Sequence, residues 1–360
     1  MSVISPLTVA RAAVLLLGLA VCMPVTADAG QTTRSRSTKS SKVASSKAKK
    51  PTYSARSSRA RKARLARARA AARAREQARL RHLRALQEAM TPRYKTDATG
   101  SLVPDVRAAA AIIFDPETGQ VLWEENGSDQ RSIASITKVM TAVVFMEDDP
   151  DLSRVVTIER GDVYAASTTY LRANERVTLD NLLHMTLIAS DNAAARALAR
   201  LSHGGTAAFI ERMNEKALEF GLENTSFADP SGLNPNNVSS AYDLSRLITF
   251  AAADERLGAI MRKASHPVST SRRTITINNT NQLVRGGDVG TMEVMGGKTG
   301  FIGKAGYCLA TLLRLPQNNH QVAVVVLGAS SNTGRFWETR HLFNWLSDKA
   351  ADLFSKDQQQ

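Results

Sequence analysis

The sequence predicts a mixed α/β (α+β) fold in which one sheet is flanked by helices and carries an additional helical lobe. From Ser135 to about Ala252, apolar residues recur at three- and four-residue spacing, which is typical of amphipathic helices. Strand patterns lie on both sides of this helical stretch, at 108–114, 120–123, 306–313 and 321–327. Strands at both ends of a helical middle favour one sheet covered by helices.

Local signals define the individual elements. The apolar run 108–114, the turn residues Asp115-Pro116-Glu117-Thr118-Gly119 and the run 120–123 together predict a hairpin. The β-branched alternation of Arg273–Ile277 predicts a further strand. Helical spacing predicts helices at 180–188, 192–201, 206–220, 241–253 and 334–354.

The N-terminus resembles an export signal. Arg11 precedes an apolar run from Ala12 to Met23, and Ala27-Asp28-Ala29 offers small residues where a signal peptidase cleaves. A membrane-spanning helix needs about 20 apolar residues, so a signal peptide over residues 1–29 is the favoured interpretation. We therefore expect an exported, periplasmic protein that is soluble or associated with the wall.

Residues 30–95 form a basic arm rich in Ala, Arg, Lys and Ser. The stretch 31–95 holds 21 Lys or Arg and two acids, a net charge of +19, which leaves 96–360 with −5. We expect this arm to be disordered at first and then partly helical. Its interpretation stays open between a charged spacer and a ligand of anionic wall polymers or lipid head groups, and nucleic acid is not expected as a partner of an exported protein.

Ser135-Ile136-Thr137-Lys138 brings a hydroxyl and an amine together. Residues three apart lie on the same face of a helix. A serine hydroxyl is a weak nucleophile until a neighbour takes its proton, and a buried lysine of lowered pKa can take it. The pattern favours Ser135 as a nucleophile and Lys138 as its base, with a solvated lysine on a helix as the alternative.

Ser190-Asp191-Asn192 precedes an Ala-rich helix. These residue types cap helix N-termini, so a plain cap is one interpretation. The functional interpretation uses the Ser190 hydroxyl as a proton relay and the Asn192 amide as a clamp on the substrate backbone.

Gly297-Lys298-Thr299-Gly300 indicates a strand that another backbone approaches closely. Lys298 would lower the pKa of Lys138 and attract an anionic substrate, and the Thr299 hydroxyl would bind a carboxylate. A Gly-rich edge turn is the alternative.

The three motifs occur in a fixed order, S-x-x-K at Ser135, S-D-N at Ser190 and K-T-G at Lys298, and this set marks class A β-lactamases and penicillin-binding proteins. The chain resembles the low-molecular-mass penicillin-binding proteins, the serine D-alanyl-D-alanine carboxypeptidases and endopeptidases. The resemblance runs from about residue 108 to about residue 346 and includes the phrases 221–227, 230–233 and 298–306.

The resemblance implies an antiparallel sheet covered by helices on both sides, a catalytic domain at 96–360 and an inserted lobe that carries Ser190. It implies that Ser135 forms an acyl-enzyme, that Lys138 is the base, and that the backbone amides of Ser135 and Phe301 form an oxyanion hole. Substrate would also be bound at Asn192, Lys298, Thr299 and Gly300. The expected partners are peptidoglycan stem peptides, with β-lactam antibiotics as covalent inhibitors. No cofactor and no metal are expected, since the six histidines show no ligand spacing.

Within this family we favour an endopeptidase that cuts peptidoglycan cross-bridges. Only 62 residues follow Lys298 and the last of them are polar, so we do not expect the extra β-rich domain and amphipathic C-terminal helix of many carboxypeptidases. A carboxypeptidase is the alternative. A class A β-lactamase is less favoured, because Glu219-Phe220-Gly221-Leu222-Glu223-Asn224 misses the Glu-x-x-Leu-Asn register of the deacylating glutamate. A non-catalytic wall-binding module is disfavoured by the intact motifs.

Overall fold

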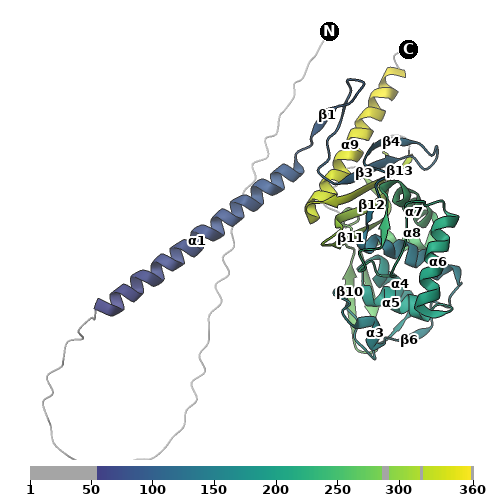
Figure 1. Ribbon diagram of the computed structural model, residues 1–360, viewed down its shortest axis with the longest axis horizontal. Helices are drawn as coiled ribbons and strands as arrows, with labels where there is room; N and C mark the ends of the chain where they lie inside the picture. The colour runs from purple at the N-terminus through teal and green to yellow at the C-terminus, as the bar shows by residue number, and fades with distance from the viewer. Residues whose placement is uncertain (1–54, 286–291, 317–318, 358–360) are drawn as a thin grey trace, which may run out of the picture. The chain divides into compact units, whose positions relative to one another are not determined.

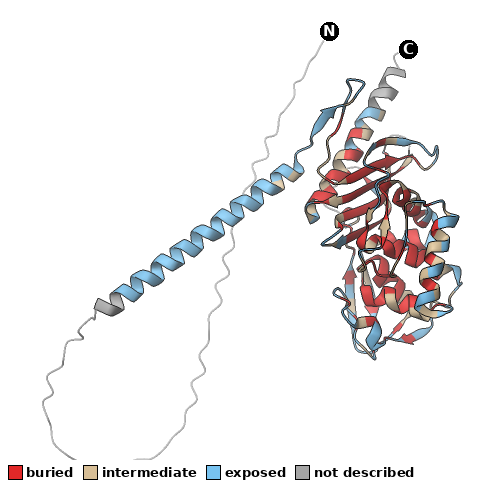
Figure 2. Cartoon of the chain, in the orientation of Figure 1, coloured by how far each residue is buried: buried red, intermediate tan, exposed pale blue. Residues whose placement is uncertain are grey.

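The computed structural model describes residues 55–285, 292–316 and 319–357. The chain divides into two units, 1–66 and 67–360, and the globular part belongs to the second. The expected signal peptide and the arm up to residue 54 lie outside the described residues. Helix α1 (Ala55–Met90) is exposed along nearly its whole described length (Figure 2). None of the helices within the described ranges combines the length and apolar character needed to cross a bilayer.

A five-stranded antiparallel sheet forms the centre of the globular part, with the strand order β11–β12–β13–β3–β4 (Figure 1). The β3–β4 hairpin turns at Gly119, whose N–H donates to the Asp115 carbonyl at 2.9 Å and whose φ of +75° favours glycine. The predicted hairpin and the antiparallel sheet are thus confirmed. The strands are β3 (Ala110–Phe114), β4 (Val121–Glu125), β11 (Glu293–Ile302), β12 (Gly306–Arg314) and β13 (Gln321–Ala329).

Helices cover both faces of this sheet (Figure 1). Alternation along β13 explains this: Val322, Val324 and Val326 pack into the core beneath α9 (Asn332–Asp357). The intervening Ala323, Val325 and Leu327 belong to the core that includes α7 (Ala241–Ala253). A strand buried on both faces reads as the continuous apolar run seen here.

The helical lobe packs on the second core and is built around α2 (Lys138–Glu147) and the pair α4 (Leu179–Leu187) and α5 (Asn192–Leu201). Thr178 and Asp191 cap α4 and α5 through their side chains. The remaining elements are β1 (Tyr94–Thr96), β2 (Leu102–Pro104), β5 (Arg131–Ser132), η1 (Ala134–Thr137), β6 (Val155–Thr157), α3 (Arg160–Val163), β7 (Arg176–Thr178), α6 (Gly205–Glu219), β8 (Val238–Ser239), α8 (Glu255–Met261), β9 (Ser265–Ser269) and β10 (Thr274–Asn278).

Two elements differ from the sequence expectation. The strand predicted at 273–277 is β10, but it pairs with β9 in a separate two-stranded sheet. The helix expected from Ser135 begins instead with the 3₁₀ turn η1 and continues as α2 from Lys138.

Candidate active site

Ser135 lies on the 3₁₀ turn η1, where two other backbones close in on it. A Cβ atom at Gly232 would lie 2.1 Å from the Ala134 carbonyl oxygen, and one at Gly300 would lie 2.5 Å from the Ile133 carbonyl oxygen. Glycine at both positions therefore lets the loop after Pro230 and strand β11 approach the turn. Ala134 adopts φ +49°, a left-handed conformation held by these contacts.

Lys138 lies directly behind Ser135. Its side chain is 0% exposed, and its Nζ donates to Ser135 Oγ at 3.0 Å, to Asn192 Oδ1 at 2.6 Å and to the Ser231 carbonyl. The pKa of Lys138 is lowered from 10.5 to about 7, chiefly because burial penalises the charged ammonium.

Charged neighbours modify this effect. The carboxylates of Asp191 and Asp229 favour the ammonium and raise the pKa of Lys138, whereas the cation of Arg196 lowers it. Lys138 and Lys298 repel one another when both are charged, and the charge of Lys138 lowers the pKa of Lys298. The amine of Lys138 can therefore accept the proton of the Ser135 hydroxyl near neutral pH.

The second and third motifs meet across the site. Lys298 Nζ on β11 donates to Ser190 Oγ at 2.8 Å and to the Thr299 carbonyl at 3.0 Å. Lys298 is 1% exposed, and its pKa lies well below 10.5 because of burial, the charge of Lys138 and that of Arg335. Ser190 adopts φ +59°, an uncommon conformation for a non-glycine residue that is found at functional sites.

These residues border one cleft of about 400 Å³ between β11 and the helical lobe. Of the expected site residues, Ser135, Ser190, Asn192, Thr299, Gly300 and Phe301 line it. Lys138 and Lys298 contact the lining hydroxyls from beneath. The structure thus brings all eight expected residues together.

The backbone of β11 faces the nucleophile. A Cβ atom at Gly300 would lie 3.1 Å from the Ser135 nitrogen, so the strand and the turn are nearly in contact. The ring of Phe301 is 51% exposed and stacks on Tyr307 with a centroid distance of 4.2 Å.

Sequence reasoning missed several cleft residues. Ser167 and Thr168 form part of the wall on the lobe side, and Thr280 Oγ1 accepts from the Thr299 hydroxyl at 2.7 Å. Arg335 donates to the Gly300 carbonyl at 2.9 Å. None of these residues belongs to a short motif, so only the fold reveals them.

Asp229 is also a finding of the structure. Its carboxylate accepts from the N–H groups of Ser231 at 2.8 Å and of Asn234 at 2.7 Å. This shapes the loop that presents the Ser231 carbonyl to Lys138. The segment 230–233, which resembles the family, was the signal in the sequence that pointed to this loop.

A possible group of metal ligands lies elsewhere. Among the described residues, ligand atoms of Asp180, His184 and His266 lie within 4.8 Å of one another. Lys263 Nζ already donates to His184 Nε2 at 2.8 Å, and the two imidazoles are stacked 3.8 Å apart. Stacked rings direct their lone pairs side by side rather than at one point, so this arrangement does not fit a cation.

Comparison with known proteins agrees with the geometry. The Peptidase S11 model, D-alanyl-D-alanine carboxypeptidase, matches residues 97–331. The chain is 32% identical over 253 residues to a D-alanyl-D-alanine endopeptidase of Escherichia coli (strain K12), covering 69% of this chain and 80% of that protein. It is 32% identical over 234 residues to a D-alanyl-D-alanine carboxypeptidase of Bacillus subtilis (strain 168), covering 62% of this chain and 58% of the other.

The fold is similar to the crystal structure of the Streptomyces K15 DD-transpeptidase, with a TM-score of 0.62 and 27% identity over 67% of this chain and 97% of that one. The expected family and fold class are therefore confirmed, and the chain is a hydrolase that belongs to the Peptidase S11 family of D-alanyl-D-alanine carboxypeptidases.

Proposed function

We propose that the chain is a serine D-alanyl-D-alanine endopeptidase that hydrolyses peptidoglycan cross-bridges through an acyl-enzyme on Ser135. The observation that carries this proposal is the 3.0 Å contact between Ser135 Oγ and Lys138 Nζ, whose pKa is about 7. At neutral pH and above, a large fraction of Lys138 is an uncharged amine beside the nucleophile. Members of this family act on stem peptides and bind β-lactams.

Acylation begins when Lys138 accepts the hydroxyl proton and Ser135 Oγ attacks the carbonyl carbon of the D-Ala–D-Xaa bond. The negative charge on the carbonyl oxygen is stabilised by the backbone amides of Ser135 and Phe301, each worth roughly 3–4 kcal/mol in comparable sites. The leaving amine receives this proton from Lys138 through the Ser190 hydroxyl, which Lys298 holds at 2.8 Å, so Lys138 is neutral again. Lys138 then takes a proton from the water that attacks the acyl ester and passes it to Ser135 Oγ as the ester bond breaks, which releases the product.

The substrate carboxylate and backbone are bound by the other side of the cleft. Thr299 and Arg335 line the cleft, and Lys298 contacts the lining Ser190, which provides one hydroxyl and two basic groups for a carboxylate. Asn192 is expected to contact the substrate backbone, although its Oδ1 accepts from Lys138 and its Nδ2 donates to the Ala166 carbonyl at 2.7 Å. Substrate must therefore share or displace one of these hydrogen bonds.

Endopeptidase activity is favoured over the other family reactions. The E. coli relative carries that name, and the B. subtilis relative keeps carboxypeptidase as the second candidate. Against a β-lactamase, Glu219 forms an ion pair with Lys216 and borders a different hollow with Phe114 and Phe250. No glutamate is among the described residues that line the cleft, so a penicillin acyl-enzyme should persist.

Purified cross-linked muropeptide dimers test this proposal, with an uncross-linked pentapeptide as the competing substrate. We expect dimers to become monomers, and Ser135→Ala to abolish the reaction while the surface control Ser153→Ala does not. Loss of only the terminal D-Ala from the pentapeptide would assign carboxypeptidase activity instead. Unchanged turnover in Ser135→Ala would show that the reaction does not pass through an acyl-enzyme on Ser135.

We further infer that the protein is exported and that its basic arm holds it on anionic wall polymers or lipid head groups. The described part of the arm, helix α1, carries 11 arginines and two glutamates over 36 residues and exposes its leucines singly. This composition supports electrostatic attraction to an anionic surface rather than binding of an apolar partner. Binding of purified sacculi and anionic vesicles should weaken from low to high salt, and deletion of 31–95 should remove it. Equal binding by the deletion variant would leave the arm as a spacer.

A further inference from the structure

One wall of the cleft is an irregular segment of the lobe, residues 165–171, which we call the rim segment. Its residues Ser167 and Thr168 line the cleft beside Ser135. Ala165 and Ser167 adopt φ +48° and +60°. Such conformations are costly for non-glycine residues and persist only where surrounding contacts fix them.

The carboxylate of Asp191 supplies the central contacts. One oxygen, Oδ2, accepts from the Tyr170 N–H at 2.6 Å and from Thr169 Oγ1 at 3.0 Å, while Oδ1 accepts from the Ala194 N–H at 3.0 Å. Asp191 is 0% exposed. It therefore does more than cap α5: one oxygen holds the helix end and the other holds the rim segment.

The rest of α5 supports the same segment. Asn192 donates through its backbone N–H to the Thr168 carbonyl at 3.0 Å and through its side chain to the Ala166 carbonyl at 2.7 Å. Further along the helix, Arg196 donates to the Tyr164 carbonyl at 2.7 Å.

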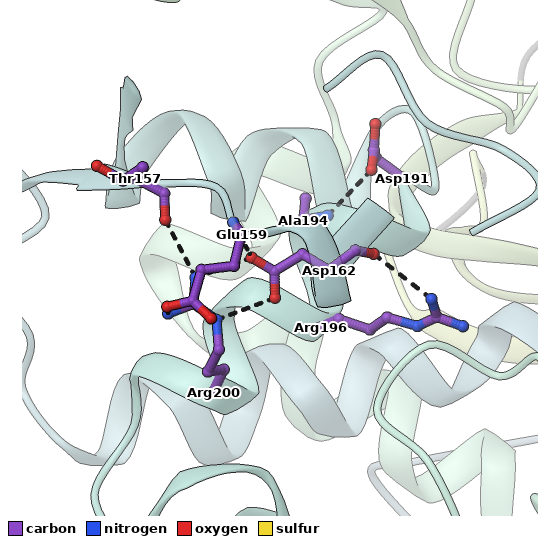
Figure 3. A network of polar contacts seen from close by, with 7 residues as sticks. All are labelled: Thr157, Glu159, Asp162, Asp191, Ala194, Arg196 and Arg200. Atoms are coloured by element: carbon purple, nitrogen blue, oxygen red, sulfur yellow. Dashed lines mark hydrogen bonds and ion pairs between the residues drawn. The ribbon is translucent and has the colours of Figure 1, made fainter. Parts of the chain in front are cut away.

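The far end of α5 fixes the element that precedes the rim segment. Arg200 binds the buried Asp162 through two nitrogens, at 3.0 and 2.8 Å, and Asp162 closes the capping box of α3 with Glu159 (Figure 3). Figure 3 also shows Asp191 against Ala194 at the opposite end of the helix. Helix α5 thus fixes the chain from α3 to the rim segment, and its first residue, Asn192, also binds Lys138.

We propose that Asp191 is a positioning residue that holds the rim segment as the wall against which a long peptide substrate aligns. This inference rests on the proposed peptidase function. Ser167 and Thr168 offer hydroxyl and backbone hydrogen-bonding groups suited to an extended peptide. A cross-linked peptide is long enough to use this wall, whereas a small β-lactam needs chiefly Ser135 and the β11 edge.

Asp191→Asn separates the two duties of the carboxylate. The remaining oxygen can still accept from Ala194, so the helix cap is kept, since Asn and Asp cap equally well. The new NH₂ group then faces the Tyr170 N–H, a donor against a donor, and the rim contact is lost. Asp254→Asn is the matched control, because Asp254 caps α8 through the Leu257 N–H at 2.8 Å, and its hydrogen bonds within the described residues do not involve the rim segment.

The experiment compares two reactions at pH 8.5, where Lys138 is largely neutral in both proteins. We expect Asp191→Asn to lower kcat/KM for cross-linked dimers roughly tenfold or more, as typical for loss of a hydrogen bond to a buried charged group. The rate constant for acylation by benzylpenicillin should change less than about threefold, within the effect of the control. Equal losses in both reactions, or no loss with dimers, would overturn the proposal.

Hydrogen exchange provides a readout that does not depend on turnover. The amides of the rim segment should exchange faster in Asp191→Asn than in the wild type or Asp254→Asn, and equal exchange would contradict the inference. If Asp191→Asn does not fold, Thr169→Val removes one donor to Asp191, together with the acceptor of the Leu171 N–H at 3.0 Å, and should give the same pattern more weakly. A wild-type enzyme that leaves dimers uncut would refute the proposed function, while the exchange result would still decide the role of Asp191.

Discussion

The pH dependence of Ser135 acylation reports directly on the buried base. Lys138 must be neutral to take the proton, and its pKa is about 7 instead of 10.5. At pH 8 about nine-tenths of Lys138 would be neutral, against about 0.3% for an ordinary lysine, a difference of roughly 300-fold.

The sign follows from the proton count. Below pH 7 the amine is protonated and cannot act as a base, so the acylation rate should fall about tenfold per pH unit. Above about pH 8 the rate should be constant. The assay is stopped-flow mixing with a fluorescent penicillin from pH 5 to pH 10, with the thermal transition measured at each pH to confirm that the protein is folded.

We call the fall of the acylation rate below pH 7 the acid limb of the pH profile. Two variants should shift this limb along the pH axis in opposite directions. Arg196→Gln removes a cation that lowers the pKa of Lys138, so the limb should shift to higher pH. Asp191→Asn removes a carboxylate that raises it, so the limb should shift to lower pH. An acylation rate that keeps rising to pH 10, or an acid limb at the same pH in both variants and the wild type, would refute Lys138 as the proton acceptor.

Three further predictions concern two residues near Ser135 and the lifetime of its penicillin adduct. Lys298→Ala removes the group that holds Ser190 and should lower turnover about a hundredfold, measured with dimers at saturating concentration, while a fall in affinity alone would assign Lys298 to binding. Gly232 has φ +81°, and Gly232→Ala would place a Cβ atom 2.1 Å from the Ala134 carbonyl oxygen. Calorimetry should show a loss of about 2 kcal/mol or more in unfolding free energy, and acylation of Ser135 should be slower. Benzylpenicillin should leave an adduct that outlasts many substrate turnovers, and rapid hydrolysis followed by absorbance would point to a lactamase.

The layered fold was largely predictable because its signals are local. The apolar run of β13 and the turn at Gly119 depend on neighbouring residues alone, and both appear as expected. Pairing is not local: the alternation in β10 predicted a strand but could not identify β9 as its partner. Nor could helical spacing predict the 3₁₀ turn at Ser135, which depends on the close approach of Gly232 and Gly300.

The candidate site was predictable as far as its motifs reach. Ser135, Ser190 and Lys298 stand in short patterns whose chemistry is recognisable, and the fold brings them to one cleft. Asp229 and Arg196 act on Lys138 only because a loop and helix α5, which are distant in the sequence, converge on it. The sequence left Asp191 open between a helix cap and a chemical role, and only its hydrogen bonds to Thr169 and Tyr170 reveal a third possibility.

The most direct test of this account is the intact mass of the full chain after incubation with benzylpenicillin, followed by peptide mapping of the adduct. The account predicts one penicilloyl group per molecule, located on Ser135 and absent from Ser135→Ala. An adduct on another residue, or an unmodified protein that still cleaves cross-linked dimers, would contradict the claim that Ser135 is the nucleophile.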